Sequence, residues 1–228
     1  MKIKPSHFLK TFLFIGIICL MMSCVKNDNF DLDTKVRFFN VVDQAAQDFY
    51  LSGTRLSTGI SYGNNSSYIV AAGDKEYQII AKNAGMQLGN DTLKYTLDVG
   101  KNYSVYYIKT SAKDSVLKVY EDDLTPDTSK SRLFFINVGY TLSSRVSIRN
   151  EDSKIINTTL GNGEKSGYII IPTGKNSKLY FNLTDSTGVI DTISYTNFYK
   201  GKTYTILIDG VNKGTSTGKL RERLIVNN

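Results

Sequence analysis

Arg37-Phe38-Phe39-Asn40-Val41 decides the fold, because the stretch recurs further along the chain as Phe134-Phe135-Ile136-Asn137-Val138. The recurrence continues in the same order through Tyr68 and Tyr168, Gly73 and Gly174, Asp91-Thr92-Leu93-Lys94-Tyr95-Thr96 and Asp191-Thr192-Ile193-Ser194-Tyr195-Thr196, and Gly100-Lys101-Asn102-Tyr103 and Gly201-Lys202-Thr203-Tyr204. The offset between the copies grows from 97 at Asn40 to 101 at Gly100. Collinear matches at this spacing indicate one duplication and not a short solenoid repeat.

Both copies are rich in short runs in which β-branched and aromatic residues alternate with polar ones, the pattern of half-buried strands. In the first copy the expected strands are 36–41, 67–71, 76–82, 92–98, 103–109 and 115–121. In the second they are 132–138, 145–149, 167–171, 177–183, 189–196, 204–209 and 219–226. Glycine turns separate these runs and no stretch has sustained helical periodicity. The sequence therefore predicts an all-β chain of two tandem antiparallel β-sandwich domains, immunoglobulin-like or transthyretin-like.

The repeat and the composition also predict the domain organisation. Residues 1–23 are expected to be a signal peptide and 24–34 a lipidated tether. The first sandwich is expected at 35–124, the linker at 125–131 and the second sandwich at 132–228. The linker segment is polar, contains Pro126 and falls where the repeat places a boundary.

The N-terminus has the layout of an export signal. Three lysines precede an apolar run from Phe12 to Met22, which is shorter than the roughly 20 residues that a membrane span needs. The run ends at Ser23-Cys24, which resembles the lipobox of bacterial lipoproteins, in the looser form of Bacteroidetes-type proteins. The resemblance implies cleavage before Cys24 and a diacylglycerol on its thiol. Lys26 stands where an inner-membrane retention signal would have Asp, so we expect lipid anchoring to the outer membrane, on its periplasmic or surface face.

The repeated positions also resemble a known family, the bacterial domain of unknown function 4397, which often occurs as tandem copies in secreted or lipidated proteins. The resembling features are Val36 to Val41, Tyr62-Gly63, Gly73, Gly100-Lys101-Asn102-Tyr103 and Glu121-Asp122-Asp123-Leu124. They cover roughly residues 35 to 210. Family members usually carry Ser-Pro-Asp-Ala after the first strand, where this chain has Val42-Asp43-Gln44-Ala45-Ala46. The resemblance implies a fold and no activity.

Composition excludes several kinds of chemistry. The formal net charge is +7, and loss of the three signal lysines lowers it to +4, with the remaining basic residues scattered among acids. A nucleic-acid partner is not expected, because phosphate binding favours a clustered basic face. His7 is the only histidine and lies in the signal; Cys19 lies there too, so Cys24 is the only mature cysteine. We therefore expect no histidine-based catalysis, no metal site, no cofactor and no enzyme.

Carboxylates and tyrosines leave two alternatives. Glu121, Asp122 and Asp123, or Asp91 and Asp191, are the acids available to a glycoside hydrolase or a weak Ca²⁺ site, but a solvated strand end is the favoured interpretation. A sugar platform could use the tyrosines at 62, 68, 106, 107 and 168, although packing in the core is favoured.

Four hydroxyls stand in Asp-Ser/Thr-apolar triplets that resemble the Bacteroidetes-type O-glycosylation acceptor. They are Thr92, Ser115, Ser186 and Thr192. Ordinary strand-start chemistry explains the triplets equally well.

The leading hypothesis is a non-catalytic lipoprotein of the cell envelope that binds or supports a surface or periplasmic partner, which could be a protein or a glycan. The alternative is a glycan-binding protein of an outer-membrane nutrient-uptake system. A carboxylate-based glycoside hydrolase is the least favoured reading.

Overall fold

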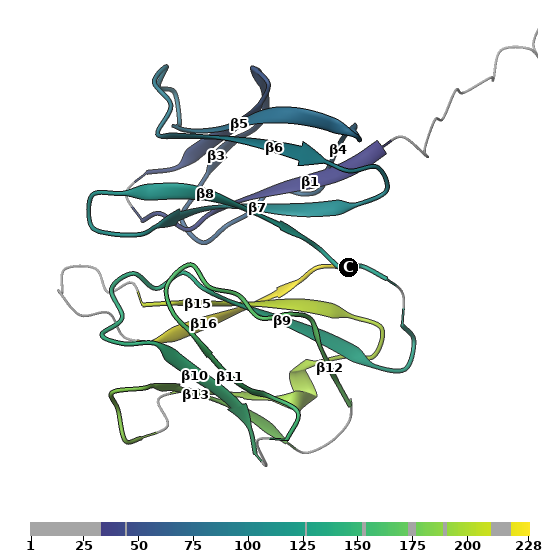
Figure 1. Cartoon of the computed structure of the whole chain (residues 1–228), viewed down its shortest axis with the longest axis vertical. Coiled ribbons are helices and arrows are strands. Elements are labelled where there is room, and N and C mark those ends of the chain that lie inside the picture. The colour runs from purple at the N-terminus through teal and green to yellow at the C-terminus, as the bar shows by residue number, and fades with distance from the viewer. Residues whose placement is uncertain are drawn as a thin grey trace, which may run out of the picture. The chain divides into compact units, whose positions relative to one another are not determined.

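The computed structural model describes residues 33–43, 45–125, 127–151, 154–172, 177–188, 191–210 and 220–228 as an all-β protein (Figure 1). The strands ahead of the predicted linker are β1 (Asp33–Asn40), β2 (Gln47–Leu51), β3 (Thr54–Ile60), β4 (Ile69–Ala72), β5 (Lys75–Asn83), β6 (Asp91–Leu97), β7 (Asn102–Lys109) and β8 (Ser115–Glu121). Those after it are β9 (Ser131–Asn137), β10 (Val146–Asn150), β11 (Asn157–Leu160), β12 (Ile169–Ile171), β13 (Lys178–Leu183), β14 (Asp191–Ser194), β15 (Thr203–Asp209) and β16 (Arg221–Val226). A short 3-10 turn, η2 (Tyr195–Asn197), follows β14.

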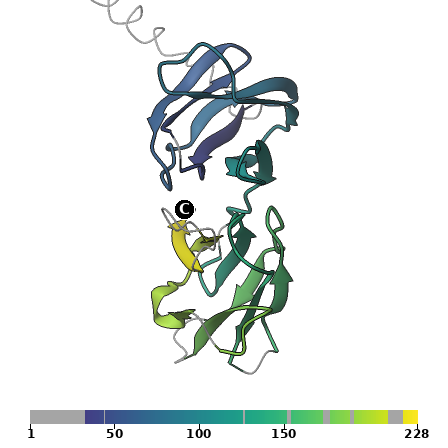
Figure 2. The ribbon, with the colours of Figure 1, turned by 90° about the vertical axis from the view of Figure 1, so that its left-hand side faces the viewer.

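The strands form two sandwiches with the same connectivity (Figures 1 and 2). In the first, the sheets have the orders β4-β1-β7-β8 and β3-β2-β5-β6; in the second, the orders are β12-β9-β15-β16 and β11-β10-β13-β14. We call the sheets built on β1 and β9 the inner sheets and those built on β2 and β10 the outer sheets. The all-β, sandwich-like fold predicted from the sequence is confirmed. Each inner sheet contains one parallel pair, β1 with β7 and β9 with β15, which the sequence did not predict.

The strands β1 and β9 are buried on both faces, which explains their nearly continuous apolar sequence. Alternate residues of β1 point in opposite directions. Val36 and Phe38 enter the core of the first sandwich, while Phe39 faces the second inner sheet. In β9, Phe135 enters the core of the second sandwich and Phe134 faces the first inner sheet.

The outward faces of the two inner sheets share a third apolar cluster, which we call the junction core. Its buried members are Phe39, Val41, Tyr106, Ile108, Phe134, Ile136, Val138 and Leu207. The rings of Phe39 and Tyr106 stack at 4.5 Å, and Tyr120 of β8 lies 6.0 Å from Phe134 of β9. Both sandwiches belong to one compact unit of the chain. The sandwiches therefore meet through a buried, apolar and aromatic-rich interface.

Three strands were missing from the sequence prediction: β2, β3 and β11. In β2 the polar residues Gln47 and Asp48 are buried, so the alternation expected of a strand is masked. The Asp48 carboxylate accepts hydrogen bonds from the Thr58 hydroxyl at 2.9 Å and the Gly59 amide at 2.8 Å. Those bonds hold an irregular edge strand, β3, whose own sequence is mostly polar.

Candidate functional site

Asp122 lies at the centre of a polar cluster between the sandwiches. It follows β8 directly and is only 4% exposed. Its carboxylate accepts hydrogen bonds from the hydroxyls of Ser104 at 2.5 Å, Tyr68 at 2.7 Å and, from the second sandwich, Tyr168 at 3.4 Å. The prediction of a solvated strand end is therefore wrong at Asp122, because the second sandwich supplies a tyrosine that covers it.

Arg37 supplies the positive charge of this cluster and is equally buried. Its guanidinium lies 3.7 Å from Asp122, donates to Ser104 at 2.8 Å and donates to Asn227 of the second sandwich at 2.8 Å. It also lies over the rings of Phe39 and Tyr68. Burial raises the pKa of Asp122 despite the nearby Arg37. We call Arg37, Tyr68, Ser104, Asp122, Tyr168 and Asn227 the Asp122 cluster.

A second polar cluster joins the sandwiches around Asp209, which is fully buried at the end of β15. Arg221 and Arg223 of β16 donate to its carboxylate at 3.0 and 2.7 Å. Tyr62 of the first sandwich donates to it at 2.9 Å and lies under the Arg223 guanidinium. Burial and the Asp209 charge raise the pKa of Tyr62 to about 12, so its hydroxyl keeps its proton at neutral pH.

Gly63 makes this second cluster possible, because Arg223 occupies the space that a side chain would need. A Cβ at Gly63 would lie 1.3 Å from Arg223 Nη1, and Gly63 has φ +77°. We expect Gly63→Ala to lower the free energy of unfolding by about 2–4 kcal/mol, through backbone strain and displacement of Arg223. Urea unfolding measures the change. The matched control is Gly53→Ala, at φ +87° in open space, which should cost about 1 kcal/mol. Equal losses in the two variants would contradict the close approach.

The five tyrosines of the sugar-platform hypothesis are all engaged in packing. Tyr106 is buried in the junction core, and Tyr107 is buried in the core of the first sandwich. Tyr62 and Tyr168 pack against the junction core, and Tyr68 lies under the Arg37 guanidinium. Their hydroxyls donate to Asp209 or Asp122. The packing interpretation is confirmed, since two of the five side chains are buried and the other three are half-buried.

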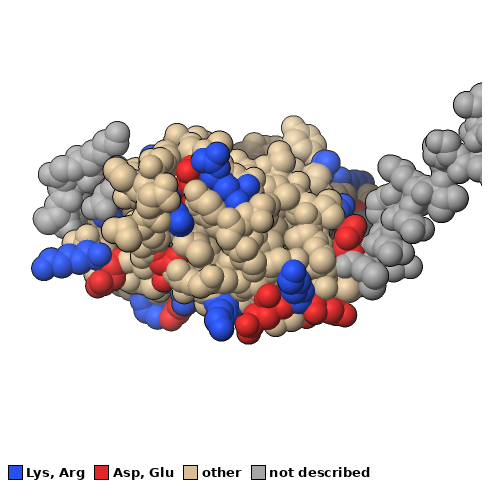
Figure 3. Space-filling view, turned by 90° about the horizontal axis from the view of Figure 1, so that it is seen from above, with Lys and Arg blue, Asp and Glu red and all other residues tan. Residues whose placement is uncertain are grey.

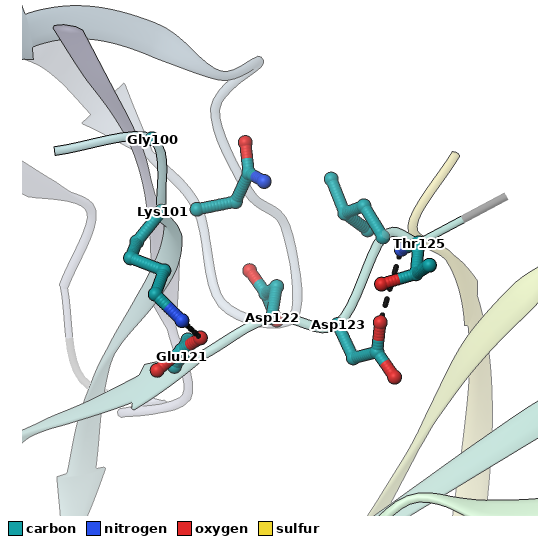
Figure 4. Close-up of a pocket in the computed structure, with 8 residues that line it drawn as sticks. Gly100, Lys101, Glu121, Asp122, Asp123 and Thr125 are labelled. Carbon is teal, nitrogen blue, oxygen red and sulfur yellow. Dashed lines mark hydrogen bonds and ion pairs between the residues drawn. The ribbon is translucent and has the colours of Figure 1, made fainter. Parts of the chain in front are cut away.

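An open polar pocket of about 630 Å³ lies beside the Asp122 cluster (Figure 4). It is lined by Gly100, Lys101, Asn102, Glu121, Asp122, Asp123, Leu124 and Thr125. Lys101 Nζ contacts Glu121 Oε1 at 2.6 Å, and Asp123 accepts the Thr125 amide at 3.0 Å. Asp122 and Asp123 leave the chain in opposite directions, as expected of neighbours in an extended segment (Figure 4). The three acids were candidates from the sequence, but the pocket that they line was not predicted.

Asp91 and Asp191 stand in different outer sheets, at the starts of β6 and β14. The Asp91 carboxylate accepts the Leu117 amide at 2.6 Å. The counterpart of Leu117 in the second sandwich is Glu222, which lies beside Asp191. Burial and the adjacent Asp191 carboxyl raise the pKa of Glu222 to about 7. Repeat two therefore carries a carboxyl pair where repeat one carries a leucine.

This pair predicts that stability depends on pH. The pKa of Glu222 is higher in the folded than in the unfolded chain, so its contribution is complete below the unfolded value near 4.5 and is lost as pH rises through about 7. We expect the melting temperature to fall between about pH 5 and 8 and Glu222→Gln to flatten that fall. Thermal unfolding followed by circular dichroism measures the melting temperature at each pH, and the variant Glu76→Gln, at an exposed position, is the control. An unchanged slope in Glu222→Gln would refute the assignment.

The four predicted O-glycosylation positions lie at or near the surface. Thr92, Ser186 and Thr192 are exposed and Ser115 is half-buried. Asp91 accepts the Thr92 amide and Asp191 accepts the Thr192 amide, both at 2.8 Å. The two threonines thus have the same local geometry, and modification of all four stays a prediction.

The remaining predictions concern the signal, membrane spans and metal sites. Cys24 and the signal lie outside the described residues. Within the described ranges no helix is long and apolar enough to cross a membrane, and no group of three or more His, Cys, Asp or Glu is placed to hold a metal ion. Figure 3 shows one face of the molecule, on which basic and acidic residues are interspersed.

The fold and the buried clusters define a class of protein: all-β, with two sandwiches joined through their inner sheets. The chain belongs to the family described as "Domain of unknown function (DUF4397)", whose model matches residues 34–149. The match spans β1–β8 and continues through the linker into β10. The family resemblance inferred from the sequence is confirmed, while tandem copies and the boundaries at 35–124 and 132–228 stay predictions.

Solved structures of other proteins show weak likenesses to this chain. A carbohydrate-binding module of family CBM26, from Amy13K of Eubacterium rectale, solved in complex with maltoheptaose, is 9% identical in sequence. The alignment covers 86% of this chain and 98% of that one, with a TM-score of 0.28. A TM-score this low carries no argument about function. No curated protein matches the chain.

Proposed function

We propose that the chain is a non-catalytic module of the cell envelope whose two sandwiches act as one rigid body to support or bind a protein partner. The junction core carries this proposal. The two inner sheets share an apolar, aromatic-rich interface and are joined by hydrogen bonds from Tyr62 to Asp209, from Tyr168 to Asp122 and from Arg37 to Asn227, so they have little freedom to hinge. A fixed spacing between its ends suits a support or a binding platform better than a flexible tether would.

Anchoring at Cys24 would place this body at the outer membrane. Nine positions separate Cys24 from Asp33, the first residue of β1. A chain of that length reaches at most about 30 Å, so the first sandwich would stay close to the lipid headgroups. Several acyl chains, each methylene contributing about 0.8 kcal/mol, would hold it firmly.

The anchor has a direct test. Cells fed labelled palmitate should yield labelled protein, and Cys24→Ser should abolish the label because the thiol is the attachment point. Expression of both forms is checked by immunoblot. Label that persists in Cys24→Ser, or wild-type protein without label, would contradict lipidation. Protease shaving of intact cells then distinguishes the surface from the periplasm.

O-glycosylation of the surface hydroxyls can be tested on the same native protein. Mass spectrometry of the native chain should show hexose additions on peptides that contain Thr92, Ser115, Ser186 or Thr192. Alanine at Thr92 and Thr192, whose local geometry is shared, should remove two of them. Unmodified native peptides would remove the idea.

Glycan binding is the second candidate function, and the polar pocket at residues 100–125 is the observation that favours it. A glycoside hydrolase is not favoured. The Asp122 carboxylate is occupied by three hydroxyl donors, and Asp91 is bonded to two backbone amides. Neither acid is free to transfer a proton or attack a sugar.

A further inference from the structure

We infer that the pocket beside the Asp122 cluster binds a neutral, hydroxyl-rich ligand, a short saccharide. This inference deepens the second candidate function and rests on it, while the rigid-body proposal is independent of it. The volume, about 630 Å³, falls in the range of about 300–1,000 Å³ that is usual for small-molecule sites.

The charges that line the pocket are already paired, which determines the class of ligand. Lys101 is paired with Glu121 at 2.6 Å, and Asp123 lies 3.5 Å from Arg132. A charged ligand would have to displace one of these partners. A neutral ligand with many hydroxyls can instead accept from Lys101 and donate to the outer carboxylate oxygens without breaking either pair.

Asn102 provides the group that is free to bind. It lines the pocket, it is half-buried, and no described residue bonds its side-chain amide. An amide offers both donors and acceptors, so it can bond two neighbouring hydroxyls of a sugar ring. Leu124 adds an apolar contact suited to the C–H face of such a ring.

The equivalent turn of the second sandwich differs in its side-chain partners. Gly201, Lys202 and Thr203 are the counterparts of the residues at 100–102. The Gly201 amide donates to the Lys130 carbonyl at 2.9 Å, and the Gly100 amide makes the matching bond to the Asp33 carbonyl at 2.8 Å. The backbone carbonyl of Asn228 accepts a hydrogen bond from the Lys202 ammonium at 2.9 Å, and its side-chain carbonyl accepts one from the Thr203 amide at 2.8 Å. A Cβ at Gly201 would lie 3.3 Å from the Asp127 carbonyl oxygen, whereas a Cβ at Gly100 would meet no described atom within 4 Å.

Nuclear magnetic resonance titration of the mature chain, with Cys24 replaced by serine, tests the inference. The probes are di- and trisaccharides of glucose, mannose, galactose and N-acetylglucosamine at tens of millimolar, with sorbitol as the acyclic control. We expect at least one saccharide to shift the amide signals of residues 100–102 and 121–125 in a saturable way. No saturable shift with any saccharide, or equal shifts with sorbitol, would overturn the inference.

Matched variants locate the site. Asn102→Ala and Lys101→Met should each weaken binding about tenfold, the effect of losing one or two hydrogen bonds. Lys202→Met, the counterpart in repeat two, should bind as the wild type does. Asn102→Asp retains the shape of the side chain and serves if Asn102→Ala is poorly folded. Equal affinities in the Asn102 and Lys202 variants would place the ligand elsewhere, and neither result would alter the test of rigidity.

Discussion

Replacement of Asp122 by alanine is expected to lower the free energy of unfolding by about 3–5 kcal/mol, because it leaves the buried Arg37 without its counter-charge. It also removes the acceptor of Ser104, Tyr68 and Tyr168. Since Tyr168 belongs to the second sandwich, the loss should weaken the junction and not only the end of β8. Urea unfolding followed by circular dichroism gives the value.

Two further variants separate charge from packing. Lys101→Met breaks the half-exposed ion pair with Glu121, next to the same strand ends, and should change the free energy of unfolding far less than Asp122→Ala does, because solvent screens the pair. The double variant Arg37→Met with Asp122→Leu removes both buried charges and should recover much of the loss, because desolvation opposes a buried pair. A loss in Asp122→Ala no larger than in Lys101→Met would show that the Asp122 cluster does not stabilise the fold.

Replacement of Phe134 by alanine is expected to lower the free energy of unfolding by about 3–5 kcal/mol and also to loosen the junction. Phe134 is buried on the outward face of β9, stacked on Tyr168 at 5.0 Å and near Tyr120 of the first sandwich. Loss of the ring opens a cavity between the inner sheets. We therefore expect trypsin to cleave the linker at Lys130 faster under native conditions.

The neighbouring Phe135 provides the control. Its side chain points the other way, into the core of the second sandwich, so Phe135→Ala should lower stability by a similar amount. Under native conditions it should leave cleavage at Lys130 close to the wild-type rate, because the junction core keeps its ring. Equal cleavage rates in the two variants would contradict a specific role for the junction core.

The sequence predicted the strands that carry strong alternation and the duplication that relates them. The repeat around Arg37 and Phe134 marked the central strands β1 and β9, and the glycine turns marked the ends of their neighbours. The hairpin of β2 and β3 was not predictable, because a strand with buried Gln47 and Asp48 looks like a polar loop. Their burial depends on partners at Thr58, Asn83 and Asn90, which local periodicity does not reveal.

The two polar clusters could not be predicted from the sequence, for a related reason. A period of two says that Phe38 and Phe39 lie on opposite faces, but not that another sheet covers the second face. Asp122 therefore looked like the end of a solvated strand. Two signals were available, of which the first is that Tyr68 and Tyr168 occupy matched positions in the repeats; both donate to the same carboxylate. An arginine between apolar residues in β1 was the other.

The distance between spin labels on the two outer sheets tests the rigid-body proposal most directly. Cysteines at Lys94 of β6 and Thr192 of β14, both exposed, would carry the labels in a chain with Cys24 replaced by serine. Double electron–electron resonance should give one narrow distance distribution that high salt does not broaden, because buried charges are poorly screened. A broad distribution, of the kind that a flexible linker produces, would contradict the proposal.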